Sequence, residues 1–220
     1  MRRGVTLEEI SDGKLYGLQD MVNVGCQDCA GCSACCTGMG NSIVLDPLDI
    51  YRFSRHFSQT FEELLVDKIE LAVEGGLILP HIRMDEKTER CVFLNKEGRC
   101  TIHKERAGLC RIFPLGRYYR DGKIYYILQT NECKKENRTK EKVKKWIDTP
   151  DIKQNEQFLL VWHNLLEQLE TWAKTAKEEQ QKTLVLYLLQ VFYRNPYNTT
   201  EDFYPQFFER EQAFRTVLHI

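Results

Sequence analysis

The spacing of apolar residues separates a mixed first part of the chain from a helical last part. From Phe158 on, apolar positions recur at intervals of four and three, which is typical of an amphipathic helix. A more apolar run at 184–192 and the segment 203–220 predict two further helices. We expect the first helix to pack on the other two through one stripe: Phe158, Trp162, Leu165, Leu169, Trp172 and Ala176.

Capping signals predict two helices in the first third of the chain. Asp46-Pro47 suits a helix start, because Asp can accept a hydrogen bond from the first turn and Pro fits the first helical position. Thr60 and Glu63 have the spacing of a capping box, so a second helix is expected after Thr60. We expect Gly75-Gly76 to end it. Ile43–Leu45 is predicted as a short strand. The weak periodicity before the cysteines predicts a short helix or an extended arm.

A hairpin is predicted around the turn at 95–98. If Leu94 pairs with Arg99, the thiols of Cys91 and Cys100 lie on the same face of that hairpin, since side chains alternate along a strand. A shift of one residue would place them on opposite faces. The pairing therefore decides whether this segment can present two thiols together.

The segment from 103 to 148 continues with short elements. Residues 103–110 predict a helical turn, and Asp121-Gly122 predicts a second hairpin through a type I′ turn. From Lys134 the pattern favours a helix, with basic residues along a solvated face. The fold class expected is α+β, with a small cysteine-cluster metal domain with short hairpins at 1–148 and a helical C-terminal extension at 149–220.

Composition and charge limit the partners and the compartment. The net charge is −1, so no global field draws the protein to nucleic acid or membrane. No run of residues approaches the roughly 18 apolar positions of a membrane span. The N-terminal residues lack the apolar region of a signal peptide, so we expect a cytoplasmic protein. Thiols stay reduced there, and clustered cysteines are then expected to bind metal rather than form disulfides.

Five of the nine cysteines lie between residues 26 and 36. Cys-x2-Cys-x2-Cys spacing lets one loop give three thiolates to a [4Fe–4S] cluster, with the fourth from elsewhere. Structural zinc more often uses two separated Cys-x2-Cys pairs. The pattern favours an iron–sulfur cluster, with zinc as the alternative. The number of thiols allows either one site with spare cysteines or two sites of four.

The order of the motifs resembles the YkgJ-type cysteine cluster family, which carries a zinc- or iron-chelating CxxCxxCC domain. The match begins with Cys29-x2-Cys32-x2-Cys35-Cys36 after which come Cys91, Cys100-Thr-Ile-His103, Arg106-x3-Cys110-Arg111 and Cys133. It departs from the family in having Ala107 where Pro is usual and Lys-Lys after Cys133. Neither departure removes a thiol.

The resemblance implies a bacterial or archaeal metal-binding protein. It implies the following metal ligands: Cys29, Cys32, Cys35, Cys36, Cys91, Cys100, Cys110 and Cys133. Cys26 lies outside the family motif and ranks last among the candidates. The cysteine region is also similar to flagellin lysine N-methylase, which makes protein methylation an activity by analogy only. No Gly-rich loop after a strand independently predicts a nucleotide or S-adenosylmethionine site.

Three polar residues near the distal cysteines are candidates for contacts with the cofactor. His103 could bind the metal or donate to a ligand sulfur, although a histidine satisfied by other polar groups is the commoner case. Arg106 and Arg111 could donate hydrogen bonds to sulfur and offset thiolate charge. A surface salt bridge is the alternative for both arginines.

Three functions follow from these observations. The first is an iron–sulfur protein with a redox or maturation role and an unidentified protein or redox partner. The second is a zinc-stabilised interaction module, and the third is an enzyme that modifies protein. Nucleic-acid binding through the lysines at 134–145 is disfavoured, because no wider basic surface is visible. A homodimer through leftover apolar surface stays open.

Overall fold

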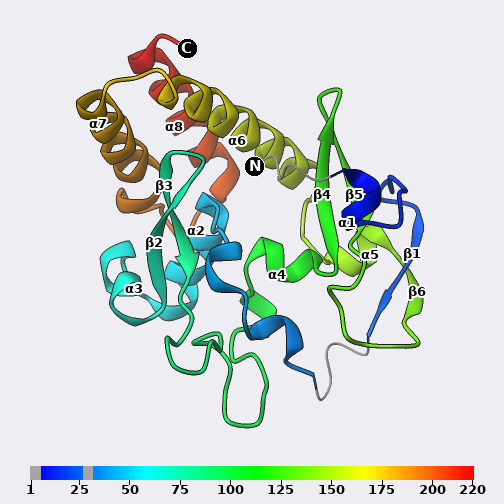
Figure 1. Cartoon of the computed structure of the whole chain (residues 1–220). Coiled ribbons are helices and arrows are strands. Elements are labelled where there is room, and N and C mark those ends of the chain that lie inside the picture. The colour runs from blue at the N-terminus through cyan, green and yellow to red at the C-terminus, as the bar shows by residue number, and fades with distance from the viewer. Residues whose placement is uncertain (1–5, 27–31) are drawn as a thin grey trace. The chain divides into compact units, whose positions relative to one another are not determined.

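The computed structural model describes residues 6–26 and 32–220 and has an α+β fold, as predicted (Figure 1). Its strands form three separate antiparallel pairs, β1 with β6, β2 with β3 and β4 with β5. The chain forms two compact units. One unit comprises Asn41–Arg83 with Val161–Ile220, and the other comprises residues up to Gly40 with Met84–Leu160. No helix of the described residues is long and apolar enough to cross a membrane.

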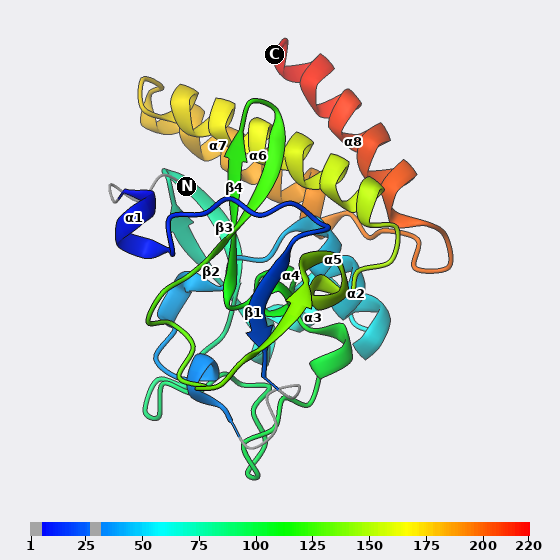
Figure 2. The same ribbon diagram turned by 90° about the vertical axis from the view of Figure 1, so that its right-hand side faces the viewer.

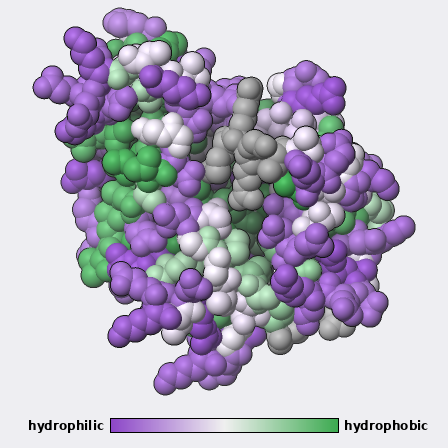
Figure 3. Space-filling model, in the orientation of Figure 1, coloured by the Kyte–Doolittle hydropathy of each residue, from purple (hydrophilic) through white to green (hydrophobic). Residues whose placement is uncertain are grey.

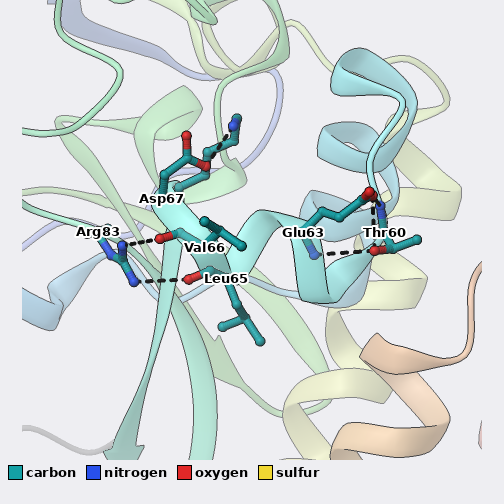
Figure 4. A network of polar contacts seen from close by, with 7 residues as sticks. Thr60, Glu63, Leu65, Val66, Asp67 and Arg83 are labelled. Carbon is teal, nitrogen blue, oxygen red and sulfur yellow. Dashed lines mark hydrogen bonds and ion pairs between the residues drawn. The ribbon is translucent and has the colours of Figure 1, made fainter.

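The first unit begins with two capped helices, as the sequence predicts. Asp46 caps α2 (Pro47–Phe57) by accepting a hydrogen bond from the Asp49 N–H at 3.0 Å. At α3 (Phe61–Asp67), Thr60 Oγ1 accepts from the Glu63 N–H at 3.2 Å, and Glu63 Oε2 accepts from the Thr60 N–H at 2.7 Å (Figure 4). Each cap satisfies N–H groups that the first helical turn leaves without partners.

The prediction that Gly75-Gly76 ends the second helix is wrong. The helix α3 ends at Asp67, and the chain then forms a hairpin of β2 (Ile69–Glu74) and β3 (Leu77–Ile82). Both glycines have positive φ and make the turn, with Glu74 opposite Leu77. Large apolar residues at every second position, Ile69, Leu71 and Val73, are compatible with a strand, which the helical interpretation overlooked.

Arg83 fixes the end of this hairpin to α3. Its Nη1 donates to the Val66 carbonyl oxygen at 2.6 Å and its Nη2 to the Leu65 carbonyl oxygen at 3.0 Å (Figure 4). Upstream, Val44 makes only an isolated bridge to His81, within the stretch predicted as a short strand. The bridge at Val44 joins the start of the segment 41–83 to β3, and Arg83 joins its end to α3.

Three C-terminal helices complete the first unit, as predicted. They are α6 (Ile152–Ala173), whose first residues belong to the other unit, α7 (Glu178–Leu189), which continues as a π-helical turn η4 (Gln190–Arg194), and α8 (Phe203–Leu218). Phe192 is the centre of an aromatic core, with its ring 5.1 Å from those of Trp162 and Phe214. Trp172, assigned to the buried stripe, is 40% exposed.

The second unit is built from two antiparallel pairs and short helices. The short helix α1 (Leu7–Ile10) precedes the strands in the chain. The strand β1 (Met21–Gly25) pairs with β6 (Thr139–Lys142), and the helix α5 (Val143–Ile147) follows β6 directly (Figure 2). The strands β4 (Leu115–Arg120) and β5 (Lys123–Leu128) form the predicted hairpin. Asp121 and Gly122 both have positive φ, as a type I′ turn requires.

The core of this unit joins residues far apart in the sequence. Its members are Val22, Val24, Ile112, Leu115, Tyr126, Leu128, Val143, Ile147 and Ile152.

The predicted basic helix from Lys134 is wrong in part, because 139–142 form β6 and only 143–147 are helical. Pairing with β1 accounts for the difference, since a partner strand far away in the sequence leaves no local signal.

Candidate metal centre

Four cysteine side chains of the second unit line one small cavity. They are Cys26, Cys32, Cys35 and Cys133, and the remaining lining residues are Ala34, Phe113, Pro114, Glu132, Lys134 and Lys135. The cavity measures about 20 Å³, room for about one water molecule. Phe113 and Pro114 supply its apolar wall. The predicted ligand Cys29 lies outside the described residues.

Local backbone structure brings these thiols together from three parts of the chain. Cys26 follows directly on β1, and Cys35 lies in the short 3-10 helix η1 (Ala34–Cys36). Cys133 lies between β5 and β6, the strand that pairs with β1. The cysteine loop therefore supplies only part of this cavity, and a segment about a hundred residues further on supplies another part.

A second group of thiols is arranged around the backbone next to Cys36. The Cys91 N–H donates to the Cys36 carbonyl oxygen at 2.8 Å, and the Gly38 N–H donates to the Glu89 carbonyl oxygen at 2.8 Å. Thr37 and Arg90 form the bridge between these two bonds. The loop with the dense cysteines is thus paired directly with the segment that carries the first distal cysteine.

The predicted pairing of Leu94 with Arg99 is wrong. Leu94 bridges to Cys100, and the Asn95 N–H donates to the Arg99 carbonyl oxygen at 2.9 Å. The Asn95 side chain also accepts from the Arg99 N–H at 2.8 Å. The turn therefore spans 95–99 and is one residue longer than the predicted four-residue turn. Beyond it lie the 3-10 helix η3 (His103–Glu105) and α4 (Gly108–Ile112), which carries Cys110. The predicted helical turn at 103–110 is thus present as two short pieces.

Electrostatic coupling ties Cys35 to this second group. A hydrogen bond with Cys36 and then burial raise the pKa of the Cys35 thiol well above its ordinary value. Burial, together with the neighbouring thiols of Cys100 and Cys35, raises the pKa of Cys91 to about 11. Burial also raises the pKa of Cys100, while the charge of Arg106 lowers it. The raised pKa values favour the protonated thiols when no metal is bound, so metal binding would have to release these protons.

The three polar candidates have different surroundings from one another. The ring nitrogens of His103 lie 2.9 and 2.5 Å from Arg106 Nη1, so this histidine is paired with an arginine. Arg106 also favours the thiolate forms of Cys35 and Cys100 through its charge. Arg111 is buried and donates to the backbone carbonyl oxygens of Asp148 and Lys104. None of the three is among the described residues that line the cavity.

The donors present suit a thiophilic metal. The cavity offers four sulfur atoms and, as oxygen ligand, only Glu132 among its described lining residues. Soft thiolates select zinc, copper(I) or iron–sulfur centres over magnesium or calcium. No group of three or more His, Cys, Asp or Glu side chains among the described residues stands close enough to hold one ion. The thiols would therefore have to turn inward to bind.

The fold and these thiols define a class, namely a small α+β protein with a sulfur-lined cavity. Residues 28–157 match the CxxCxxCC family, which is described as a "Putative zinc- or iron-chelating domain". The match covers more than half of the chain, and the chain belongs to this family. No curated protein and no solved structure matches it. The similarity to flagellin lysine N-methylase therefore stays a prediction.

Proposed function

We propose that the protein is a cytoplasmic iron–sulfur protein with a redox or maturation role. The observation that carries this proposal is the cavity lined by four thiols, next to a second thiol group that shares Cys35 with it. An all-sulfur donor set taken from one Cys-x2-Cys-x2-Cys loop and distal segments is typical of iron–sulfur ligation. The ligands proposed are Cys29, Cys32, Cys35, Cys36, Cys91, Cys100, Cys110 and Cys133.

The residues around the thiols would serve a cluster in two ways. Phe113 and Pro114 limit the access of water to the sulfur atoms. Arg106 and the two lysines Lys134 and Lys135 place positive charge near the thiolates. Nearby positive charge and exclusion of water are two of the means by which proteins set the reduction potential of a cluster. A bound cluster would supply one-electron transfer, and these residues would set its potential.

A structural zinc site is the second candidate, and one observation favours it. The segment 84–107 consists of turns, isolated bridges and one short 3-10 helix, and its buried apolar residues are Phe93, Ile102 and Ala107. Such a small core stabilises a segment of this length poorly, and a metal bound by Cys91 and Cys100 would compensate. The protein would then be an interaction module, with the metal serving its fold.

Anaerobic purification of the full chain separates the two candidates. Stoichiometric iron and acid-labile sulfide, with a visible absorption that dithionite bleaches, are the expected result. A colourless protein with stoichiometric zinc would contradict the iron–sulfur assignment. Cys35→Ser should remove most of the bound metal, because Cys35 belongs to both thiol groups. The neighbouring change Ser33→Ala is the matched control and should leave the metal content unchanged.

A further inference from the structure

Cys26 precedes the segment that defines the family, yet its side chain lies in the cavity. The family match begins at residue 28, and the sequence alone ranks Cys26 last among the ligands. In the structure Cys26 is 7% exposed and lines the cavity together with Cys32, Cys35 and Cys133. Four cysteines around one small space match the number of thiolates that a tetrahedral metal ion or a cubane cluster takes.

The position of Cys26 is fixed by strand pairing that involves no cysteine. Gly25, the last residue of β1, lies opposite Thr139, the first residue of β6. A Cβ atom at Gly25 would stand 2.0 Å from the side-chain Oγ1 of Thr139 and 3.2 Å from its carbonyl oxygen, so a side chain at this position would crowd β6. Since Cys26 follows β1 and Cys133 precedes β6, the same antiparallel pair delivers both thiols to one end. A cysteine that served only for packing would not need Cys133 beside it in the same cavity.

The charged residues of the cavity suit several thiolates in one place. Lys134 and Lys135 directly follow Cys133 and line the cavity, whereas Glu132 is its acidic member. Four thiolates carry four negative charges, which a divalent cation offsets only in part. Two ammonium groups beside the cavity would lower the remaining electrostatic cost of holding these thiolates together.

We propose that Cys26 is a metal ligand and that, with the thiols turned inward, it completes a four-cysteine centre with Cys32, Cys35 and Cys133. The thiols of Cys36, Cys91 and Cys100 belong to the second group, in which the Cys91 N–H donates to the Cys36 carbonyl oxygen. The proposal corresponds to the arrangement with two centres, with Cys35 next to both groups. The proposal rests on the proposed function only in requiring that the protein binds metal.

Metal analysis of single variants tests this assignment. In the anaerobically purified full chain, Cys26→Ser should lose the metal of one centre and Cys91→Ser that of the other, each retaining roughly half of the total. Ser33→Ala, a change outside the described lining of the cavity, should retain all of it. Retention of the full metal content by Cys26→Ser would overturn the proposal.

A ligand-retaining variant separates a role in binding from a role in folding. In cobalt-substituted protein, Cys26→His should keep the cobalt stoichiometry but lose part of the sulfur-to-cobalt charge-transfer absorption, because nitrogen replaces one sulfur ligand. An unchanged spectrum would also overturn the proposal. If the wild-type protein holds zinc and no iron or sulfide, the iron–sulfur assignment fails, while the loss of zinc in Cys26→Ser still decides the role of Cys26. A wild-type protein without any metal contradicts both.

Discussion

Arg111 provides a sharp test of how the distal cysteine segment is held in place. Its side chain is buried, with Nη1 3.1 Å from the Asp148 carbonyl oxygen and Nη2 2.5 Å from that of Lys104. Lys104 belongs to η3, between Cys100 and Cys110, so the arginine connects this segment to the residues after α5. We therefore expect a structural role for Arg111, and the contact with cluster sulfur suggested by the sequence stays a prediction.

The change Arg111→Met should lower stability because it removes both bonds and leaves two carbonyl oxygens without these donors. Hydrogen bonds from a charged donor contribute roughly 1.5–3 kcal/mol each, so we expect a loss on the order of 3 kcal/mol in the free energy of unfolding. For a chain of this size such a loss lowers Tm by roughly 6–12 °C. Thermal denaturation of the metal-loaded protein, followed by circular dichroism, measures it.

A matched exposed arginine serves as the control. Arg120 forms a surface ion pair with Asp121, and its side chain is 61% exposed. The change Arg120→Met should therefore cost less than about 0.5 kcal/mol. A wild-type Tm for Arg111→Met combined with a shifted reduction potential would refute the structural role. It would place the guanidinium at the metal centre instead.

Further predictions concern two buried titratable groups and one helix cap. Burial raises the pKa of the Glu156 carboxyl above 4.5, so the stability of the folded state falls as pH rises through that pKa. Glu156→Gln keeps an acceptor for the Tyr126 hydroxyl, and in urea denaturation it should be more stable than wild type at neutral pH but not below pH 4.5. Burial lowers the pKa of His81, whose Nδ1 faces the Asn41 carbonyl oxygen, so stability is lost as pH falls from 6.5 toward that lowered pKa. His81→Gln should reduce the dependence of stability on pH in this range, and an unchanged dependence would contradict the prediction. Thr60→Ala should cost about 1 kcal/mol by urea denaturation, and Thr60→Ser should recover most of it.

Local signals in the sequence were sufficient for elements that depend on neighbouring residues. The caps at Asp46 and Thr60, the Asp121-Gly122 turn and the three C-terminal helices are all present as predicted. Each depends on residues within a few positions of one another, so the physical cause can be read directly from the sequence.

Features that depend on distant partners escaped prediction. The strand β6 exists because β1 pairs with it, and the predicted basic helix took no account of that partner. The pairing of Leu94 with Cys100 makes the turn one residue longer than predicted, and within this turn the Asn95 side chain accepts a hydrogen bond from the Arg99 N–H. The sequence ranked Cys26 last among the candidate ligands because it lies outside the family motif, whereas the structure places it in the lining of the cavity. A sequence signal did exist, since Cys26 continues the three-residue spacing of the run backwards.

Part of the exposed apolar surface of the first unit lies over β2 and α7, as the hydropathy surface shows (Figure 3). Val73 is 72% exposed and Leu186 is 64% exposed. Nothing in the structure assigns a partner to this surface, and the homodimer suggested by the sequence stays a prediction. Sedimentation of the full chain over a range of concentrations would decide it.

The pairing of Gly25 with Thr139 also has a consequence for the order of events during synthesis. On the ribosome, β1 and the Cys26 that follows it emerge long before β6, so β1 stays without its partner until residue 142 has been made. The dense cysteines are therefore made well before the distal ones, of which Cys133 is the last. A metal ion that arrived early would meet an incomplete set of the proposed ligands. The proposed site would be complete only once the chain has been made through β6.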